Sequence, residues 1–152
     1  MKYLLLLFTS IFSCLQPNTK EVSTPKEKII SIFISTYGGD MGYLQSLKIT
    51  ADSLYFNFSL SVDSTKKKNQ TKVNGHYKLD DLIEKSLLVN FSKLTDGESR
   101  QPVDGTDTQI IINTDQHIYA VINNEGDYIW QKLQISLYEI INKEFKDSNK
   151  IK

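Results

Sequence analysis

Few residues of this chain could carry acid–base or nucleophilic chemistry. Among 152 residues there are two histidines, His76 and His117, and a single cysteine, Cys14. A histidine beside a carboxylate can act as the general base of a hydrolase. No Gly-x-Ser-x-Gly turn is present, however, and most serines fall on predicted strand faces. We therefore expect a protein that is not an enzyme and assign no catalytic residue, with a hydrolase that uses His76 or His117 as an alternative.

Metal chemistry has one candidate segment, the loop 96–107. It holds four carboxylates in twelve residues, namely Asp96, Glu98, Asp104 and Asp107. Carboxylate oxygens suit calcium, but the loop lacks the alternating Asp-x-Asp-x-Asp-Gly order, and its two Asp-Gly pairs are equally typical of turns. Neither histidine has a second ligand at the short spacing of a zinc site. We expect no metal site and no cofactor, and calcium binding by loop 96–107 stays open.

Cys14 follows a short apolar leader with a positive start at Lys2. The apolar run is about half of the ~20 residues that cross a bilayer, so it is typical of a signal peptide over residues 1–13. The segment Ile11-Phe12-Ser13-Cys14 resembles the bacterial lipobox. This resemblance implies cleavage before Cys14, a diacylglycerol thioether on its sulfur and an acylated amine. A secreted protein without a lipid is the alternative.

Residues 14–26 are polar, contain Pro17 and Pro25, and have no apolar period, which predicts a flexible tether. Leu15 follows the cysteine where inner-membrane retention favours Asp. The lipoprotein resemblance therefore implies anchoring in the outer membrane, facing the periplasm.

Lys plus Arg and Asp plus Glu both number 18, and this neutral balance argues against a nucleic-acid partner.

The remaining chain predicts one α+β domain over residues 27–146, with a frayed tail at 147–152. Alternating apolar residues predict strands, and apolar residues three to four apart predict helices. Strands are expected at 28–37, 44–50, 54–62, 71–79, 108–114 and 117–123, and helices after Asp81 and over 128–146. The order β-β-β-β-α-β-β-α favours a largely antiparallel sheet with two helices on one face.

Some of these elements carry sharper expectations. The strand 28–37 has Ile30, Ile32 and Ile34 on one face and apolar residues on the other, so it should lie centrally. The run Lys66-Lys67-Lys68 is expected at a solvated hairpin tip. Asp81 and Glu84 have the form of a capping pair for the first helix, and Asp127 is expected to cap the last.

A glycine-rich turn follows the first strand. Glycine there suggests backbone with positive φ or close approach of another chain. Aromatic and Met side chains on an exposed loop are the types favoured at protein interfaces. The candidate partner-binding residues are Tyr37, Gly38, Gly39, Asp40, Met41, Gly42 and Tyr43. The alternative is that Tyr37 and Tyr43 only cover the sheet edge.

The turn Gly38-Gly39-Asp40-Met41-Gly42, the hairpin from Thr108 to Asn123 and the helix after Asp127 together resemble the emfourin family of small metalloprotease inhibitors. The chain also resembles small lipoproteins of Gram-negative cell envelopes. These resemblances imply a membrane-tethered periplasmic domain that binds a protein partner and inhibits or protects it, with no inhibitory residue carried over. A carrier that encloses a small apolar ligand between sheet and helices is a further alternative.

Overall fold

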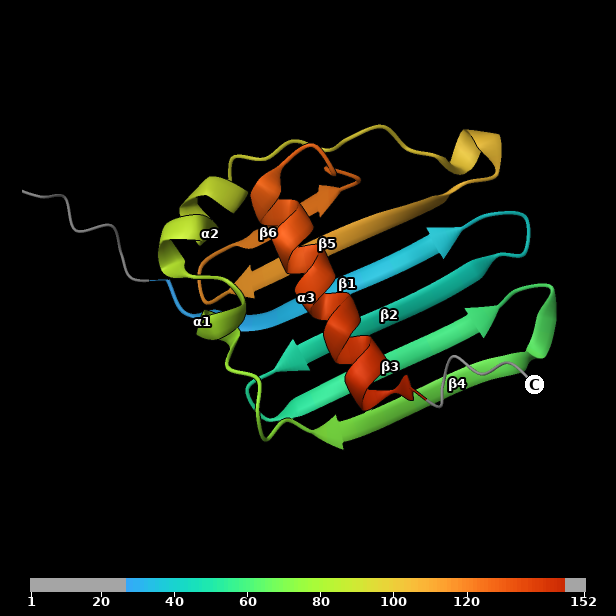
Figure 1. Ribbon diagram of the computed structural model, residues 1–152, viewed down its shortest axis with the longest axis horizontal. Coiled ribbons are helices and arrows are strands. Elements are labelled where there is room, and N and C mark those ends of the chain that lie inside the picture. The colour runs from blue at the N-terminus through green and yellow to red at the C-terminus, as the bar shows by residue number, and fades with distance from the viewer. Residues whose placement is uncertain (1–26, 147–152) are drawn as a thin grey trace, which may run out of the picture.

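The first strand of the sheet lies near its centre, as its two-sided apolar pattern predicts. The computed structural model describes residues 27–146. The strands are β1 (Ile29–Gly38), β2 (Tyr43–Thr50), β3 (Ser53–Leu60), β4 (Asp63–Val73), β5 (Thr106–Thr114) and β6 (Ile118–Ile122). They form one antiparallel sheet in the order β4-β3-β2-β1-β5-β6 (Figure 1). The predicted signal peptide, Cys14, the tether and the tail lie outside the described residues.

A β-bulge shifts the register of β1 near its start. Ile29 pairs with Thr114 while Ser31 pairs with Asn113, so Ile30 is an extra residue in β1. The bulge places Ile29 in the core and leaves Ile30 52% exposed. The prediction that Ile30 shares the core face with Ile32 and Ile34 is therefore wrong for Ile30.

The hairpin of β3 and β4 turns earlier than expected. Leu60 pairs with Asp63, so the turn consists of Ser61 and Val62. The Lys triplet 66–68 consequently lies within β4, at an edge of the sheet, and the prediction of a basic hairpin tip is wrong. The return strand predicted over 71–79 ends at Val73.

The first predicted helix is divided into α1 (Leu79–Leu82) and α2 (Lys85–Phe91). Between them Ile83 takes extended backbone, with φ −142° and ψ 115°, and its side chain is buried. Burial of Ile83 thus outweighs continuation of the helix, and the capping role predicted for Asp81 with Glu84 is wrong. A short 3₁₀ helix, η1 (Gln101–Val103), lies in the following loop.

The last helix, α3 (Tyr128–Glu144), is confirmed with its cap. The Asp127 carboxylate accepts hydrogen bonds from the backbone N–H groups of Ile129 (2.8 Å) and Trp130 (3.2 Å). Figure 1 shows α3 crossing one face of the sheet diagonally. The buried residues of its predicted stripe are Trp130, Leu133, Leu137, Ile141 and Phe145. None of the helices described in residues 27–146 is long and apolar enough to cross a membrane.

The α+β class and the antiparallel sheet are as predicted, with three α-helices in place of two. The helices α1, α2 and α3 contribute to the same core as the sheet residues. At the far end of α3, the Phe145 ring stacks on Phe56 of β3 with 4.8 Å between ring centroids. This stacking fixes the end of α3 on the sheet.

Candidate functional site

Three loops meet at the end of the sheet where β1 terminates (Figure 1). They are the turn 38–43, the turn 61–62 and the loop 100–105, and together we name them the loop surface. The backbone N–H of Gly39 donates to the Gly105 carbonyl (2.9 Å), and that of Ser61 donates to the Gly42 carbonyl (3.0 Å). Main-chain hydrogen bonds therefore hold the first turn to both of its neighbours.

Glycine is required at this junction for two physical reasons. Gly38, Gly39 and Gly42 have φ values of +112°, +70° and +57°, a region that side chains disfavour. A Cβ atom on Gly42 would also come within 2.5 Å of Ser61, and one on Gly38 within 2.9 Å of the Gly105 carbonyl oxygen. The glycine-rich turn is thus a close approach between loops of this chain.

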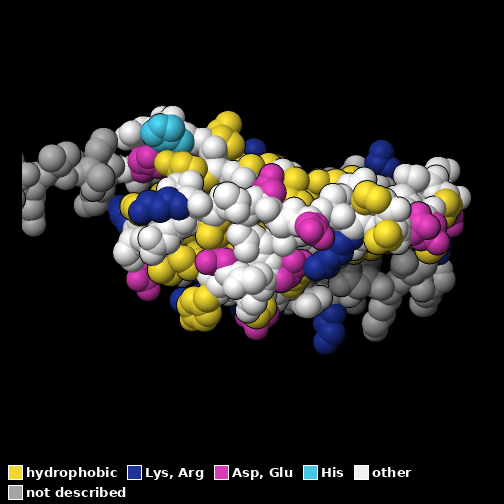
Figure 2. All heavy atoms as spheres, turned by 90° about the horizontal axis from the view of Figure 1, so that it is seen from above, with side chains coloured by type: hydrophobic (Ala, Val, Ile, Leu, Met, Phe, Trp, Pro, Cys, Tyr) yellow, Lys and Arg dark blue, Asp and Glu magenta, His cyan; other side chains and the backbone are white. Residues whose placement is uncertain are grey.

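Each of the three loops exposes one large apolar side chain. Met41 is 54% exposed, Val62 63% and Val103 80%. Figure 2 shows the molecule from above the view of Figure 1. Exposed hydrophobic side chains lie among acidic ones at its right-hand end, where the loop surface lies. Sequence reasoning identified Met41 but missed Val62 and Val103. Val62 continues the alternation of β3, and Val103 stands in a polar loop without any apolar period.

A groove of about 480 Å³ lies between the turn 38–43 and the loop 100–105. Its lining residues are Thr36, Gly38, Gly39, Asp40, Met41, Tyr43, Asp104 and Thr106. The Tyr43 ring packs edge-on against Phe58, and burial together with the nearby Tyr138 raises the pKa of Tyr43 to about 12. The Tyr43 phenol therefore stays neutral, and the carboxylates of Asp40 and Asp104 are the charged groups of the groove.

The seven predicted partner-binding residues are divided by the structure. Five of them line the groove, and Gly42 contacts Ser61. Tyr37, in contrast, pairs with Leu44 and Asp107 on the sheet face opposite to Tyr43. Burial and the charges of Asp107 and Asp96 raise the pKa of Tyr37. Tyr37 therefore does not belong to the groove.

The acidic loop is shaped by its own carboxylates. Asp107 is buried and accepts hydrogen bonds from Arg100 N (2.7 Å), Ser99 Oγ (2.7 Å), Gln101 Nε2 (3.1 Å) and Asn123 Nδ2 (2.7 Å). Burial raises the pKa of Asp107, but these hydrogen bonds outweigh it and lower that pKa to about 2. Its ionised carboxylate is thus the hub that sets the shape of loop 100–105.

The other carboxylates of loop 96–107 do not converge with Asp107 on one point. Asp96 accepts a hydrogen bond from the backbone N–H of Ile122 (2.9 Å). Within residues 27–146, no group of three or more His, Cys, Asp and Glu side chains is placed to hold a metal ion. The hydrogen bonds of Asp96 and Asp107 thus stabilise the fold of the loop.

His117 lies beside a carboxylate at the opposite end of the sheet. Its Nδ1 is 2.8 Å from Glu27 Oε1, and the Tyr119 hydroxyl donates to both Glu27 oxygens (3.0 and 3.1 Å). Partial burial raises the pKa of Glu27, but the hydrogen bonds from His117 and Tyr119 outweigh it and lower that pKa. The hydrogen bonds of Glu27 with His117 and Tyr119 therefore join the start of the domain to β6 and to the residue before it.

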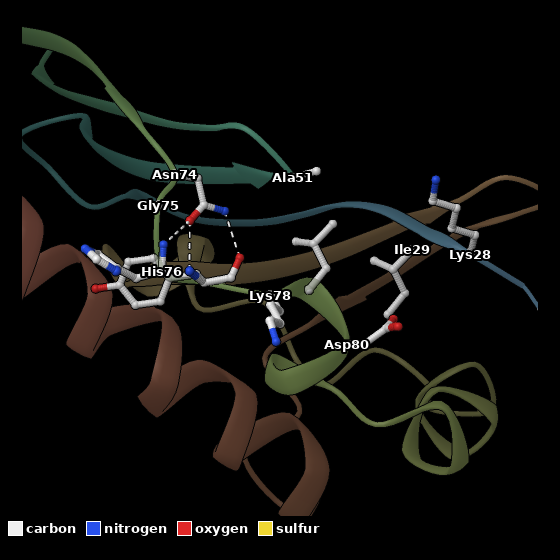
Figure 3. Close-up of a pocket in the computed structure, with 10 residues that line it drawn as sticks. Lys28, Ile29, Ala51, Asn74, Gly75, His76, Lys78 and Asp80 are labelled. Atoms are coloured by element: carbon white, nitrogen blue, oxygen red, sulfur yellow. Dashed lines mark hydrogen bonds between the residues drawn. The ribbon is translucent and has the colours of Figure 1, made fainter.

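His76 lines a second surface pocket of about 450 Å³, between the turn 74–78 and the start of β1 (Figure 3). Asn74 holds this turn: its Oδ1 accepts from Tyr77 N (2.9 Å), and its Nδ2 donates to Thr50 O (2.7 Å) and Tyr77 O (2.8 Å). Figure 3 shows His76 and Lys28 at opposite ends of the pocket, and its dashed hydrogen bonds all come from Asn74. The pocket is thus built around the hydrogen bonds of Asn74.

No protein-family model matches this chain, and no curated protein matches it. The resemblances to the emfourin family and to envelope lipoproteins stay predictions. The geometry of the loop surface is therefore the basis for a functional proposal.

Proposed function

We propose that this domain is a non-enzymatic protein-binding module, held at the outer membrane by a lipid on Cys14, that contacts a periplasmic protein partner through the loop surface. The observation that carries the proposal is the exposure of Met41, Val62 and Val103 on the turn 38–43 and on the two loops that are hydrogen-bonded to it. Inhibition or protection of the partner would follow from covering part of its surface.

The loop surface suits binding because its backbone is already ordered. Binding by a mobile loop costs conformational entropy, and a loop fixed beforehand reduces that cost. The bonds from Gly39 N to Gly105 O and from Ser61 N to Gly42 O fix the turn 38–43 on both sides. Met41 adds an unbranched, polarizable side chain that adapts to the shape of a partner.

The position of the loop surface relative to the proposed anchor also favours this role. The tether joins the domain at Glu27, and β1 begins two residues later and runs for ten residues to Gly38. At a rise of about 3.3 Å per residue, β1 spans roughly 30 Å. The loop surface therefore lies at the end of the sheet farthest from the anchor, where a partner in the periplasm can reach it.

The length of the tether is compatible with this orientation. The thirteen residues 14–26 reach at most about 45 Å when fully extended, from the maximum of about 3.3–3.6 Å per residue. This reach keeps the domain close to the membrane and still lets the loop surface point away from it. A partner in the same membrane or free in the periplasm would be accessible.

Site-specific photo-crosslinking in intact cells tests the proposal. A photoreactive phenylalanine analogue replaces Met41, Val62 or Val103 in the full-length protein, and Ile135 serves as the control because it is an exposed apolar residue on α3. The expected result is one protein adduct of the same mass from all three loop positions and none from Ile135. Adducts of equal yield from Ile135, or none from the loop positions, would contradict the proposal.

A further inference from the structure

Every second residue of β6 points its backbone N–H and C=O groups away from the neighbouring strand β5. In an antiparallel pair, the N–H and C=O groups of successive residues point alternately to the two sides of the strand. Asn123 N donates to the Thr108 carbonyl and Thr114 N donates to the His117 carbonyl, both at 2.9 Å. Odd-numbered residues at these ends of β6 thus face β5, so the N–H and C=O groups of Ile118, Ala120 and Ile122 point outward.

Of these three residues, only Ile122 has its outward backbone groups hydrogen-bonded to another part of the described chain. The Ile122 N–H donates to the Asp96 carboxylate (2.9 Å), and the Ile122 carbonyl accepts from Gly97 N (2.7 Å). In residues 27–146, no partner is found for the outward N–H and C=O groups of Ile118 and Ala120. Both residues are exposed, and Ile118 is 72% exposed.

The two edges of the sheet differ in their protection. Natural proteins block edge strands with Lys, Pro or bulges, because an unprotected edge pairs with another chain. Edge strand β4 carries the Lys triplet 66–68 and Lys72, whereas β6 reads Ile-Tyr-Ala-Val-Ile and holds no charge, proline or glycine. Strand β6 therefore lacks the lysines that protect β4, and the Asp96–Gly97 segment covers only its end at Ile122.

We propose that β6 is a strand-addition site that takes an extended, uncharged segment of a partner protein. The outward N–H and C=O groups of Ile118 and Ala120 would pair with the main chain of this segment, which is how strand addition obtains its affinity. Specificity would come from side chains that lie beside Ile118 and Ala120. The Asp96–Gly97 segment already pairs with Ile122, so it limits the incoming strand to a few residues.

A second copy of the chain is a weaker occupant of the same edge. Self-pairing about a twofold axis would run the two β6 strands antiparallel, and the two β1 strands would then begin at opposite ends. In two chains anchored through Cys14 in one membrane, both β1 strands should begin on the side that faces the membrane. The exclusion of a second copy depends on the proposed anchor, and sedimentation of the full-length protein tests for such a dimer directly.

The test uses the full-length protein in detergent micelles and the peptide acetyl-Thr-Val-Thr-Ile-Thr-Val-amide as the probe. Amide hydrogen exchange read by NMR reports on individual N–H groups. The expected result is exchange at Ile118 and Ala120 at least about fivefold slower with the peptide, with no change at Val73 of β4. A peptide that is N-methylated on the residues facing β6 should give no protection, whereas N-methylation on the alternate residues should leave it unchanged.

The variant Ala120→Pro supplies a second readout with a matched control. The Ala120 N–H points away from β5, so proline there removes no bond between β5 and β6. Protection of Ile118 by the peptide should be lost in Ala120→Pro and kept in Ala120→Val, with similar urea midpoints for both variants.

Three outcomes would overturn the proposal. They are protection that survives N-methylation on both sides, absence of protection by the unmethylated peptide, and protection without peptide in a sample that sedimentation shows to be dimeric. Because the loop surface lies on other residues, crosslinking from Met41 can fail or succeed independently of this result.

Discussion

Gly42 lies directly against Ser61, so a Cβ atom at Gly42 would be 2.5 Å from both Cβ and Oγ of Ser61. The backbone of Gly42 also has φ +57°. We expect Gly42→Ala to lower the free energy of unfolding by about 2–4 kcal/mol, because it combines an unfavourable φ with a steric overlap. Urea unfolding of the full-length protein measures this change.

Gly75→Ala is the matched control for Gly42→Ala. A Cβ at Gly75 meets no atom within 4 Å, so the same substitution should change the free energy of unfolding by less than about 1 kcal/mol. The double variant Gly42→Ala with Ser61→Gly should recover the steric part of the loss and keep the part due to φ. Equal losses at Gly42 and Gly75 would show that the loops are not packed as described.

Asp107 makes the stability of the loop depend on pH. Its pKa falls from an ordinary carboxyl value near 4 to about 2 on folding, so its contribution is complete above about pH 4 and is lost as the pH falls toward 2. Asp107→Ala should lower the free energy of unfolding at pH 7 by about 2–4 kcal/mol, because buried donors such as Asn123 Nδ2 lose their acceptor.

Urea midpoints between pH 2 and pH 7 check this prediction. The variant Asp107→Ala should show a flatter loss of stability between pH 4 and pH 2 than the unaltered protein. Asp104→Asn serves as the control, because Asp104 is exposed in the same loop and asparagine tolerates its left-handed backbone. An identical low-pH slope in the Asp107→Ala variant would contradict the hub role of Asp107.

Trp130 offers a test of the core. Its side chain is fully buried, and its Nε1 has no hydrogen-bond partner among the described residues. Trp130→Phe removes this unpaired donor and keeps an aromatic ring, so the stability loss should stay below about 2 kcal/mol. Trp130→Ala should cost about 3–5 kcal/mol through the cavity that it leaves. Comparable losses for the two variants in thermal unfolding would argue that the indole N–H is satisfied in solution.

The predicted anchor is testable by intact mass spectrometry of protein extracted from membranes. We expect a polypeptide that begins at Cys14 and carries a diacylglycerol and an amide-linked acyl chain. Each buried methylene adds about 0.8 kcal/mol, so several chains make the anchoring effectively permanent. Cys14→Ser should remove this mass and release the domain from the membrane fraction. A mature chain with a free thiol in the soluble fraction would contradict the lipoprotein prediction.

Elements with local signals were predictable from the sequence. The Asp127 cap and the stripe through Trp130, Leu133 and Leu137 define α3 without reference to any other part of the chain. The antiparallel pairing of β5 and β6 was likewise expected, since two Ile-rich runs flank the short polar segment Asp115-Gln116.

Elements decided by packing were not predictable in the same way. In the turn Ser61-Val62 only Ser61 is of a type common in turns, and serines also alternate along β3, so the alternation of β3 concealed the turn. Burial of Ile83 divides a helix whose apolar period is continuous in sequence. The candidate site was found in part, because the glycines signalled close approach, but which loops approach each other depends on the register of the sheet.

The bulge at Ile30 makes the central strand tolerant of a deletion at one point and intolerant elsewhere. Removing Ile30 would bring β1 into step with β5 and leave every later side chain on its present face, since Ile30 has no residue opposite it in β5. Removing any one residue between Ile32 and Tyr37 would instead exchange the two faces on one side of the gap, so that serines and isoleucines of β1 would each lie on the wrong face of the sheet. The length of β1 beyond its bulge is therefore fixed, whereas its entry into the sheet can lose one residue.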